Sequence, residues 1–253
     1  MSTDELIAIA FFIGVIGLTL VITYFAAKSN TGASSHYVAG GQIKGWQNGL
    51  AISGDYLSAA SFLGIAGSIA LGGFAGFYLS IGFLVAYLTV LLLVAEPMRN
   101  LGKYTLADML TSRFNARGIR AASALNTIMI STFYMIAQLV GAGALIALLL
   151  PFIPSTLAII MVGILMTVYV VIGGMIATTW IQIVKALMLI AATVALTIAV
   201  LAQFSFNPLA ILNEVQGSTD QNMVVPPAPD GFLSGLDTIS LFLAQVLGAA
   251  GLP

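Results

Sequence analysis

The chain has 253 residues, of which 60% are hydrophobic and 7% are charged, and its net charge is −1. A soluble domain carries roughly a quarter charged residues, so this composition predicts a protein whose solvent is largely lipid. The net charge offers no basic surface for nucleic acid, and a chain with no Cys and only one His, His36, cannot build a thiolate metal site, a zinc cluster or a His-based triad. These features argue against an enzyme, a nucleic-acid partner and a bound cofactor.

Hydropathy predicts an all-α integral membrane protein with about six full transmembrane helices and the start of a seventh. The first apolar segment follows Asp4 and Glu5 and has about twenty residues, which is long enough to span a bilayer and lacks the basic start of a signal peptide. The apolar segments cover residues 6–27, 47–71, 76–97, 121–150, 155–174, 178–203 and 236–253.

The basic residues predict the orientation in the plasma membrane. All of them fall on one side of the predicted spans, and the connections on the other side contain no Lys or Arg. They are Lys28 and Lys44 in the first connection, Arg99, Lys103, Arg113, Arg117 and Arg120 in the third, and Lys185 near the start of the sixth segment. The positive-inside rule therefore places the N-terminus outside and the basic connections in the cytoplasm.

Two connections have further patterns. Residues 105–115 begin with Thr105 and place Asp108 three residues later, which resembles a capping box and predicts a short helix at the cytoplasmic interface. The outer connection 204–235 contains Asn207-Pro208 and Pro-rich pairs between 226 and 231, which are typical of turns. We interpret it as an extracellular connection without a recognisable function.

The second segment carries the most informative polar residues. Asp55 lies in its middle, within the run SGDYLS (53–58). A carboxylate at bilayer depth costs several kcal/mol unless it is paired or hydrated, and Ser, Gly and Asp are poor helix formers. We therefore predict a helix that unwinds near residues 53–57, where freed carbonyls can coordinate a cation and freed amides can meet an anion. The alternative is that Asp55 hydrogen-bonds a neighbouring helix and only orders the bundle.

Several stretches resemble the solute:sodium symporter family, in particular its acetate permease branch. The run NGLAISGDYLSAASFLGIAG (48–67) is similar to the second transmembrane segment of that family, and GGMIATTWIQIVKA (173–186) is similar to a family signature with a Gly pair, a Trp and a polar residue two positions on. The other similar stretches are RNLGKYTLADML (99–110), YMIAQLVGAGALI (134–146) and FLAQVLGAAGLP (242–253).

The resemblance covers essentially the whole chain and implies the inverted-repeat transporter fold, in which one extra helix precedes two five-helix repeats. It divides the chain into an extra N-terminal helix (1–27), a cytoplasmic loop (28–46), the first repeat (47–203), an extracellular loop (204–235) and a truncated start of the second repeat (236–253). Family members close their cation site with a helix late in the second repeat. We therefore expect a truncated chain that needs the remaining half of the transporter to complete a site.

The resemblance also implies a cation site at the predicted break. In the family, two backbone carbonyls one helical turn apart in the second segment bind sodium. An ungapped match assigns these carbonyls to Gly54 and Leu57, whereas a shift of one residue assigns them to Ser53 and Tyr56, and both registers stay open. Asp55 is expected beside the site, where it raises the negative potential or ligates the cation through water.

The polar groups expected to face a substrate are Tyr56, Ser58 and Ser61 in the second segment and Tyr134 and Gln138 in the fourth. Tyr134 and Gln138 lie one turn apart on a common helix face, and a Gln side chain offers both a donor and an acceptor to a carboxylate or water. Interhelical hydrogen bonding at a Gly-rich crossing is an equally good interpretation of Gln138.

One departure from the family pattern lies in the sixth segment. Several sodium-coupled sugar and proline branches carry an acidic residue where this chain has Gln182, followed by Gln where it has Lys185, so we expect no second cation or proton role there. We expect Lys185 to snorkel to the cytoplasmic interface. Alternatively, Lys185 faces the cavity, and a substrate role for Lys185 requires this orientation.

The resemblance implies secondary active transport, in which a short monocarboxylate such as acetate enters the cell with Na⁺ or H⁺ as the coupling ion. A charge gains about 2.3 kcal/mol per 100 mV, so one cation with one acetate gains nothing from voltage. The bilayer and a small carboxylate are the expected partners. The alternatives are a symporter for another small solute, a transporter-like sensory membrane module and a truncated, inactive product.

Overall fold

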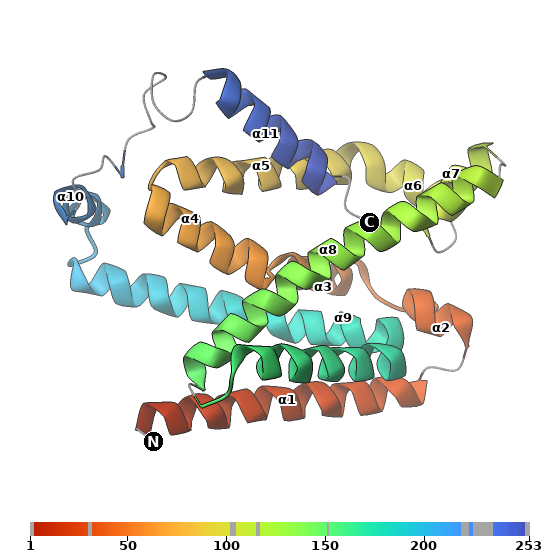
Figure 1. Cartoon of the computed structure of the whole chain (residues 1–253), viewed down its shortest axis with the longest axis horizontal. Helices are drawn as coiled ribbons and strands as arrows, with labels where there is room; N and C mark the ends of the chain where they lie inside the picture. The colour runs from red at the N-terminus through yellow and green to blue at the C-terminus, as the bar shows by residue number, and fades with distance from the viewer. Residues whose placement is uncertain are drawn as a thin grey trace. The chain divides into compact units, whose positions relative to one another are not determined.

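The computed structural model describes residues 3–29, 32–101, 105–114, 117–150, 152–218, 223–224 and 235–250. These residues form helices and no strand, which confirms the all-α prediction. Contacts divide the chain into two compact units, which are described separately. The first unit comprises Met1–Ser61 and Tyr134–Val194, and the second comprises Phe62–Phe133 and Ala195–Pro253. Figure 1 shows the helices of both units.

Among the described residues, four helices are long and apolar enough to cross a membrane. They are α1 (Thr3–Ser29), α5 (Ala75–Thr89) continued through η3 (Val90–Val94) and α6 (Ala95–Leu101), α8 (Arg117–Leu149) and α9 (Ser155–Gln203). A fifth, broken span consists of α3 (Gly45–Tyr56) with the stretch Ser61–Gly72. Large apolar side chains are widely exposed on these helices, which suits contact with lipid.

The helix α9 is too long for a single span. Its 49 residues extend ~74 Å at 1.5 Å per residue, more than twice the ~30 Å thickness of a hydrocarbon core. Gly174 has φ 58° and ψ −157°, a conformation that glycine adopts without strain, and α9 is kinked at this residue. Figure 1 shows the ribbon of α9 running back on itself. The first arm of α9 (155–173) and the second arm (175–203) thus correspond to the predicted fifth and sixth segments.

In the first unit, α1 packs against the C-terminal part of α8 and the first arm of α9. Their shared core is apolar, and Thr23 of α1 lies beside Gly173. The core consists of Ile146, Leu150 and Ala158, with Ile9, Phe12, Ile153 and Val162 packed against it. This packing holds α8 and α9 as a scaffold for the broken helix that follows α1.

The connections contain more helix than expected. The predicted cytoplasmic loop includes α2 (Ala33–Val38) and η1 (Ala39–Gly41), and the predicted outer loop includes α10 (Pro208–Ser218). The turn predicted at Asn207-Pro208 is present and leads directly into α10: the amide of Asn207 donates to the carbonyl of Phe204 (3.0 Å), and the side chain of Asn207 accepts a hydrogen bond from the amide of Leu209 (3.1 Å). Asn at the N-cap and Pro at the first helical position are favoured at a helix start. The Pro-rich pairs between 226 and 231 lie outside the described residues.

In the second unit, α5 packs against α4 (Gly64–Gly72) and α11 (Gly235–Ala250). The amide of Phe74 donates to the carbonyl of Met223 (2.8 Å), which ties the 72–75 connection to the outer connection. The helix α11 covers most of the predicted seventh segment. Residues 251–253, the last three of that segment, lie outside the described part of the chain.

The predicted capping box is confirmed at the start of α7 (Leu106–Phe114). The amide of Thr105 donates to Asp108 Oδ2 and the amide of Asp108 donates to Thr105 Oγ1, both at 3.2 Å. Asp108 also pairs with Arg120 at the start of α8 (3.5 Å). An exposed ion pair of this kind contributes about 0–1 kcal/mol to stability. Its main effect is to fix the position of α7 relative to the start of α8.

The sequence contains no Cys, so a single introduced Cys gives a maleimide one thiol to label, and its accessibility reports the side of the membrane that it faces. Ser112 in α7 and Asn213 in α10 are both exposed. We expect a membrane-impermeant maleimide to label Asn213→Cys in intact cells and to label Ser112→Cys only after permeabilisation, because the basic connections are predicted to face the cytoplasm. The opposite labelling pattern would invert the orientation.

Candidate functional site

The second predicted span is broken, as the SGDYLS run indicates. The helix α3 ends at Tyr56, Leu57 has φ −71° and ψ 74°, and Ser58 lies outside any helix. The chain then enters η2 (Ala59–Leu63), a wide π-type turn. Turns of this type are frequent at functional sites. The predicted unwinding therefore exists and begins at the C-terminal end of the range 53–57.

The break redistributes backbone hydrogen bonds. The amide of Ser58 donates to the carbonyl of Tyr56 (2.8 Å) instead of reaching Gly54, four residues earlier, as it would in a continuous helix. The carbonyl of Ser53 keeps its helical partner, the amide of Leu57 (3.1 Å). The Ser53 and Tyr56 carbonyls thus already accept hydrogen bonds, whereas the Gly54 carbonyl has lost its helical donor.

Two donors from α8 converge on one oxygen at the break. The hydroxyl of Tyr134 (3.3 Å) and the side-chain amide of Gln138 (3.1 Å) both donate to Ser58 Oγ. The hydroxyl of Ser61 donates to the carbonyl of Tyr56, so the bond between the two serine hydroxyls (3.2 Å) takes its proton from Ser58. The structure therefore brings together the polar groups that were expected to face a substrate.

Asp55 makes its direct contact with the second arm of α9. Gln182 Nε2 donates to Asp55 Oδ1 at 2.8 Å, while Gln182 Oε1 is buried without a partner among the described residues. Asp55 therefore shows both predicted features: it lies at the break, and it accepts a hydrogen bond from a neighbouring helix. The residues are 127 positions apart, and no local signal in the sequence pointed to this contact.

A close backbone approach fixes the position of Asp55. A Cβ atom placed on Gly54 would lie 2.0 Å from the carbonyl oxygen of Gln182 and 3.2 Å from Cβ of Ala186. Only a residue without a side chain therefore permits α3 to lie this close to α9. Because Asp55 follows directly, its carboxylate is held within hydrogen-bond distance of the Gln182 side chain.

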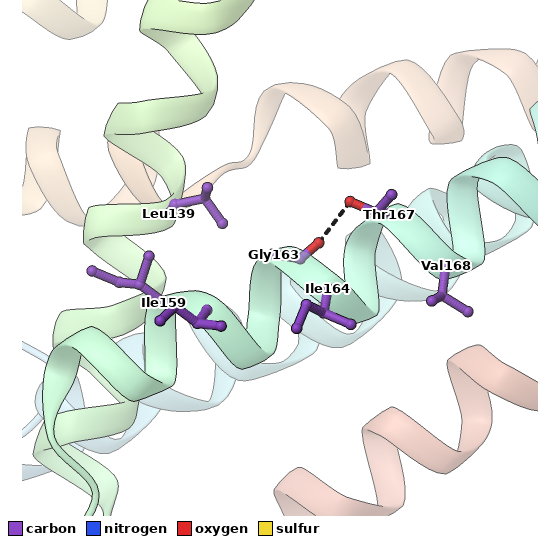
Figure 2. Close-up of a pocket in the computed structure, with 7 residues that line it drawn as sticks. Leu139, Ile159, Gly163, Ile164, Thr167 and Val168 are labelled. Atoms are coloured by element: carbon purple, nitrogen blue, oxygen red, sulfur yellow. Dashed lines mark hydrogen bonds between the residues drawn. The ribbon is translucent and has the colours of Figure 1, made fainter.

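An apolar groove between α8 and the first arm of α9 is a separate feature. Its volume is about 420 Å³. Thr167, its polar lining residue, donates its hydroxyl to the carbonyl of Gly163 in the same helix (2.8 Å), as Figure 2 shows. The other lining residues are Leu139, Ile159, Ile160, Gly163, Ile164 and Val168. Because the groove leaves no donor for an anion, it is not the candidate substrate site.

The family model described as the sodium:solute symporter family matches residues 36–253, a range that includes the break and both of its α8 donors. The chain belongs to this family. It is 57% identical over 246 residues to an uncharacterized symporter, YwcA, of Bacillus subtilis (strain 168). That match covers 97% of this chain and 48% of the relative, so the chain spans about half of the relative's length. No solved structure matches the chain.

Family membership supports the predicted class of protein, because the matched family and the relative are both described as symporters and not as enzymes. It supports neither the acetate permease branch nor a particular substrate, and both stay predictions. The roles of the predicted cation-site and substrate-site residues are likewise predictions. What the structure adds is that these residues lie together in the first unit, around the break between α3 and η2.

Gly54→Ala tests the close contact between α3 and α9. We expect it to lower the free energy of unfolding by about 1–3 kcal/mol, because the added methyl group overlaps the carbonyl of Gln182. Gly49→Ala is the matched control, since a Cβ there meets nothing within 4 Å. Thermal unfolding of the detergent-solubilised protein measures both, and equal melting temperatures would contradict the contact.

Proposed function

We propose that the chain forms the first half of a cation-coupled symporter that carries a short monocarboxylate such as acetate into the cell with Na⁺ or H⁺. Membership of the sodium:solute symporter family supports the coupling of a solute to a cation. In this proposal, residues 47–203 are the first of two five-helix repeats, and the partner half supplies the rest of the site. The N-terminus faces outward, and the membrane is the plasma membrane.

The convergence of two donors on Ser58 Oγ is the observation that carries the substrate class. A carboxylate is acceptor-only when ionised, and its hydrogen bonds are about twice as strong as those to a neutral hydroxyl. A substrate carboxylate beside Ser58 therefore competes successfully for the donors of Tyr134 and Gln138. A cationic substrate would first require both side chains to turn their oxygens toward it.

Close packing beside the donors supports a short substrate. A Cβ on Gly141 of α8 would lie 3.1 Å from Cβ of Ala59, the residue after Ser58. Helices that approach this closely leave little room for a long chain next to the carboxylate. Acetate presents only a methyl group beyond its carboxylate, so it suits the space better than larger acids.

The backbone at the break supports one register of the cation site. The carbonyls of Ser53 and Tyr56 are already hydrogen-bonded, and the amide that would bond Gly54 in a continuous helix has turned away. This favours Gly54 and Leu57 as the cation-binding carbonyls over Ser53 and Tyr56. Asp55 lies between them in sequence and supplies the negative potential that a cation requires.

Coupling to one cation makes the proposed transport step electroneutral. One Na⁺ with one carboxylate gains nothing from the membrane potential, which contributes about 2.3 kcal/mol per net charge per 100 mV. The concentration gradient of the cation then drives uptake. The first test is uptake of labelled acetate by proteoliposomes that contain a full-length symporter with this sequence, with and without an inward Na⁺ gradient. No uptake under any gradient would overturn the acetate assignment.

Tyr134→Phe tests the donors to the substrate. The loss of one hydrogen bond to a charged group is worth about 1.5–3 kcal/mol, so we expect the apparent affinity for acetate to fall roughly 10- to 100-fold. Tyr24→Phe is the matched control, because Tyr24 is exposed on α1 and packs edge-on against Phe25. Equal acetate affinities in the two variants would remove Tyr134 from the substrate site.

Asp55→Asn tests the source of negative potential at the break. We expect the stimulation of acetate uptake by an inward Na⁺ gradient to be lost, because the neutral amide no longer favours a cation. The measurement is the ratio of uptake with and without the gradient. An unchanged ratio would leave Asp55 as a packing residue bonded to Gln182.

A further inference from the structure

Only two charged residues lie inside the predicted membrane segments of the first unit. Asp55 is in the second segment and Lys185 is in the sixth, and the segments 6–27, 134–150 and 155–174 contain none. Charged residues inside spans are costly, and they usually pair with one another or face a cavity. Asp55 and Lys185 are therefore candidates to compensate each other's charge.

The second arm of α9 begins right after Gly174, so Lys185 lies farther from the start of its helix than the predicted segment 178–203 implied. Lys185 follows Gly174 by three turns, about 16 Å along the axis at 1.5 Å per residue. With the hydrocarbon core counted from Gly174, that distance reaches the middle of a core ~30 Å thick. Snorkelling serves residues near helix ends, so it does not account for a half-buried Lys at this place.

The structure brings Lys185 into the electrostatic range of Asp55. Gln182, which donates to Asp55 at 2.8 Å, lies one turn before Lys185 on the same face of α9. Ala186, the residue after Lys185, lies against α3 at Gly54, the residue before Asp55, since a Cβ on Gly54 would be 3.2 Å from Cβ of Ala186.

We propose that Lys185 is a specificity-determining residue: it balances the charge of Asp55, so that the site takes up a cation only together with a carboxylate. The inference rests on the proposed function, and it adds a physical reason for the coupling.

The physical reason is that an uncompensated net charge inside a membrane protein raises the free energy. The empty site, with one carboxylate and one ammonium group, is neutral. A cation alone would make it positive, and a substrate carboxylate alone would make it negative. Both together restore neutrality, so each favours binding of the other. Without Lys185, Asp55 and one cation would already be neutral, and the site would lose its need for an anion.

Lys185→Met tests this balance in a full-length symporter that carries this sequence. We expect ²²Na⁺ binding in the absence of acetate to become at least about tenfold tighter, because neighbouring charges shift ion affinities by one to three orders of magnitude. Uptake of labelled acetate should fall by a similar factor. Lys185→Arg keeps the charge and should behave like the parent, and Lys28→Met, at an exposed position near the end of α1, should change neither readout.

The double variant Asp55→Asn/Lys185→Met separates charge balance from direct ligation. It restores a neutral empty site, so we expect its acetate uptake to exceed that of either single variant by at least about tenfold. Uptake no higher than in the single variants would overturn the proposal, as would parent-like ²²Na⁺ binding in Lys185→Met or a loss of uptake in Lys185→Arg. Absence of acetate uptake by the parent would instead overturn the proposed function, while ²²Na⁺ binding by Lys185→Met still decides the charge balance.

Discussion

The backbone break after Tyr56 is the constraint on which the rest of the first unit depends. Inside a bilayer, every freed amide and carbonyl has to be satisfied by the protein or by a water-filled cavity. The chain meets most of this demand locally, since the amide of Ser58 and the hydroxyl of Ser61 both bond the carbonyl of Tyr56. What remains is a Gly54 carbonyl without its helical donor and a Ser58 oxygen that accepts from α8. The Gly54 carbonyl and the Ser58 hydroxyl are therefore the polar groups of the break that are available to an ion or a substrate.

Glycine crossings hold this break from two sides. Gly54 brings α3 against the backbone of α9 at Gln182, and Gly141 brings α8 against Ala59 just after the break. In lipid, helices associate through close packing and interhelical hydrogen bonds rather than through a hydrophobic effect. The same contacts that stabilise the unit therefore also set the positions of Asp55 and Ser58 relative to the donors that reach them.

Local chemistry could be predicted from the sequence, whereas distant pairings could not. The spans follow from hydropathy, the break from the SGDYLS run, and the capping box from Thr105 and Asp108, because each depends on neighbouring residues. Asn207-Pro208 closes the predicted turn and also starts α10, because the same dipeptide suits both. The bond from Gln182 to Asp55 joins residues 127 positions apart, and only the tertiary packing around Gly54 determines it.

The unpartnered oxygen of Gln182 shows how function and stability conflict at this place. A buried acceptor without a donor costs about 1–3 kcal/mol, and Gln182 Oε1 has no donor among the described residues. Leu at this position would remove that cost but would leave Asp55 without its direct donor, and Glu would set two carboxylates side by side. Rotating the amide would direct its oxygen at a carboxylate, which is repulsive. Gln182 therefore has an unsatisfied amide oxygen because its amide nitrogen holds the Asp55 carboxylate at the break. A carboxylate inside a membrane is unfavourable by itself, so its presence here is explained best by a cation that binds beside it.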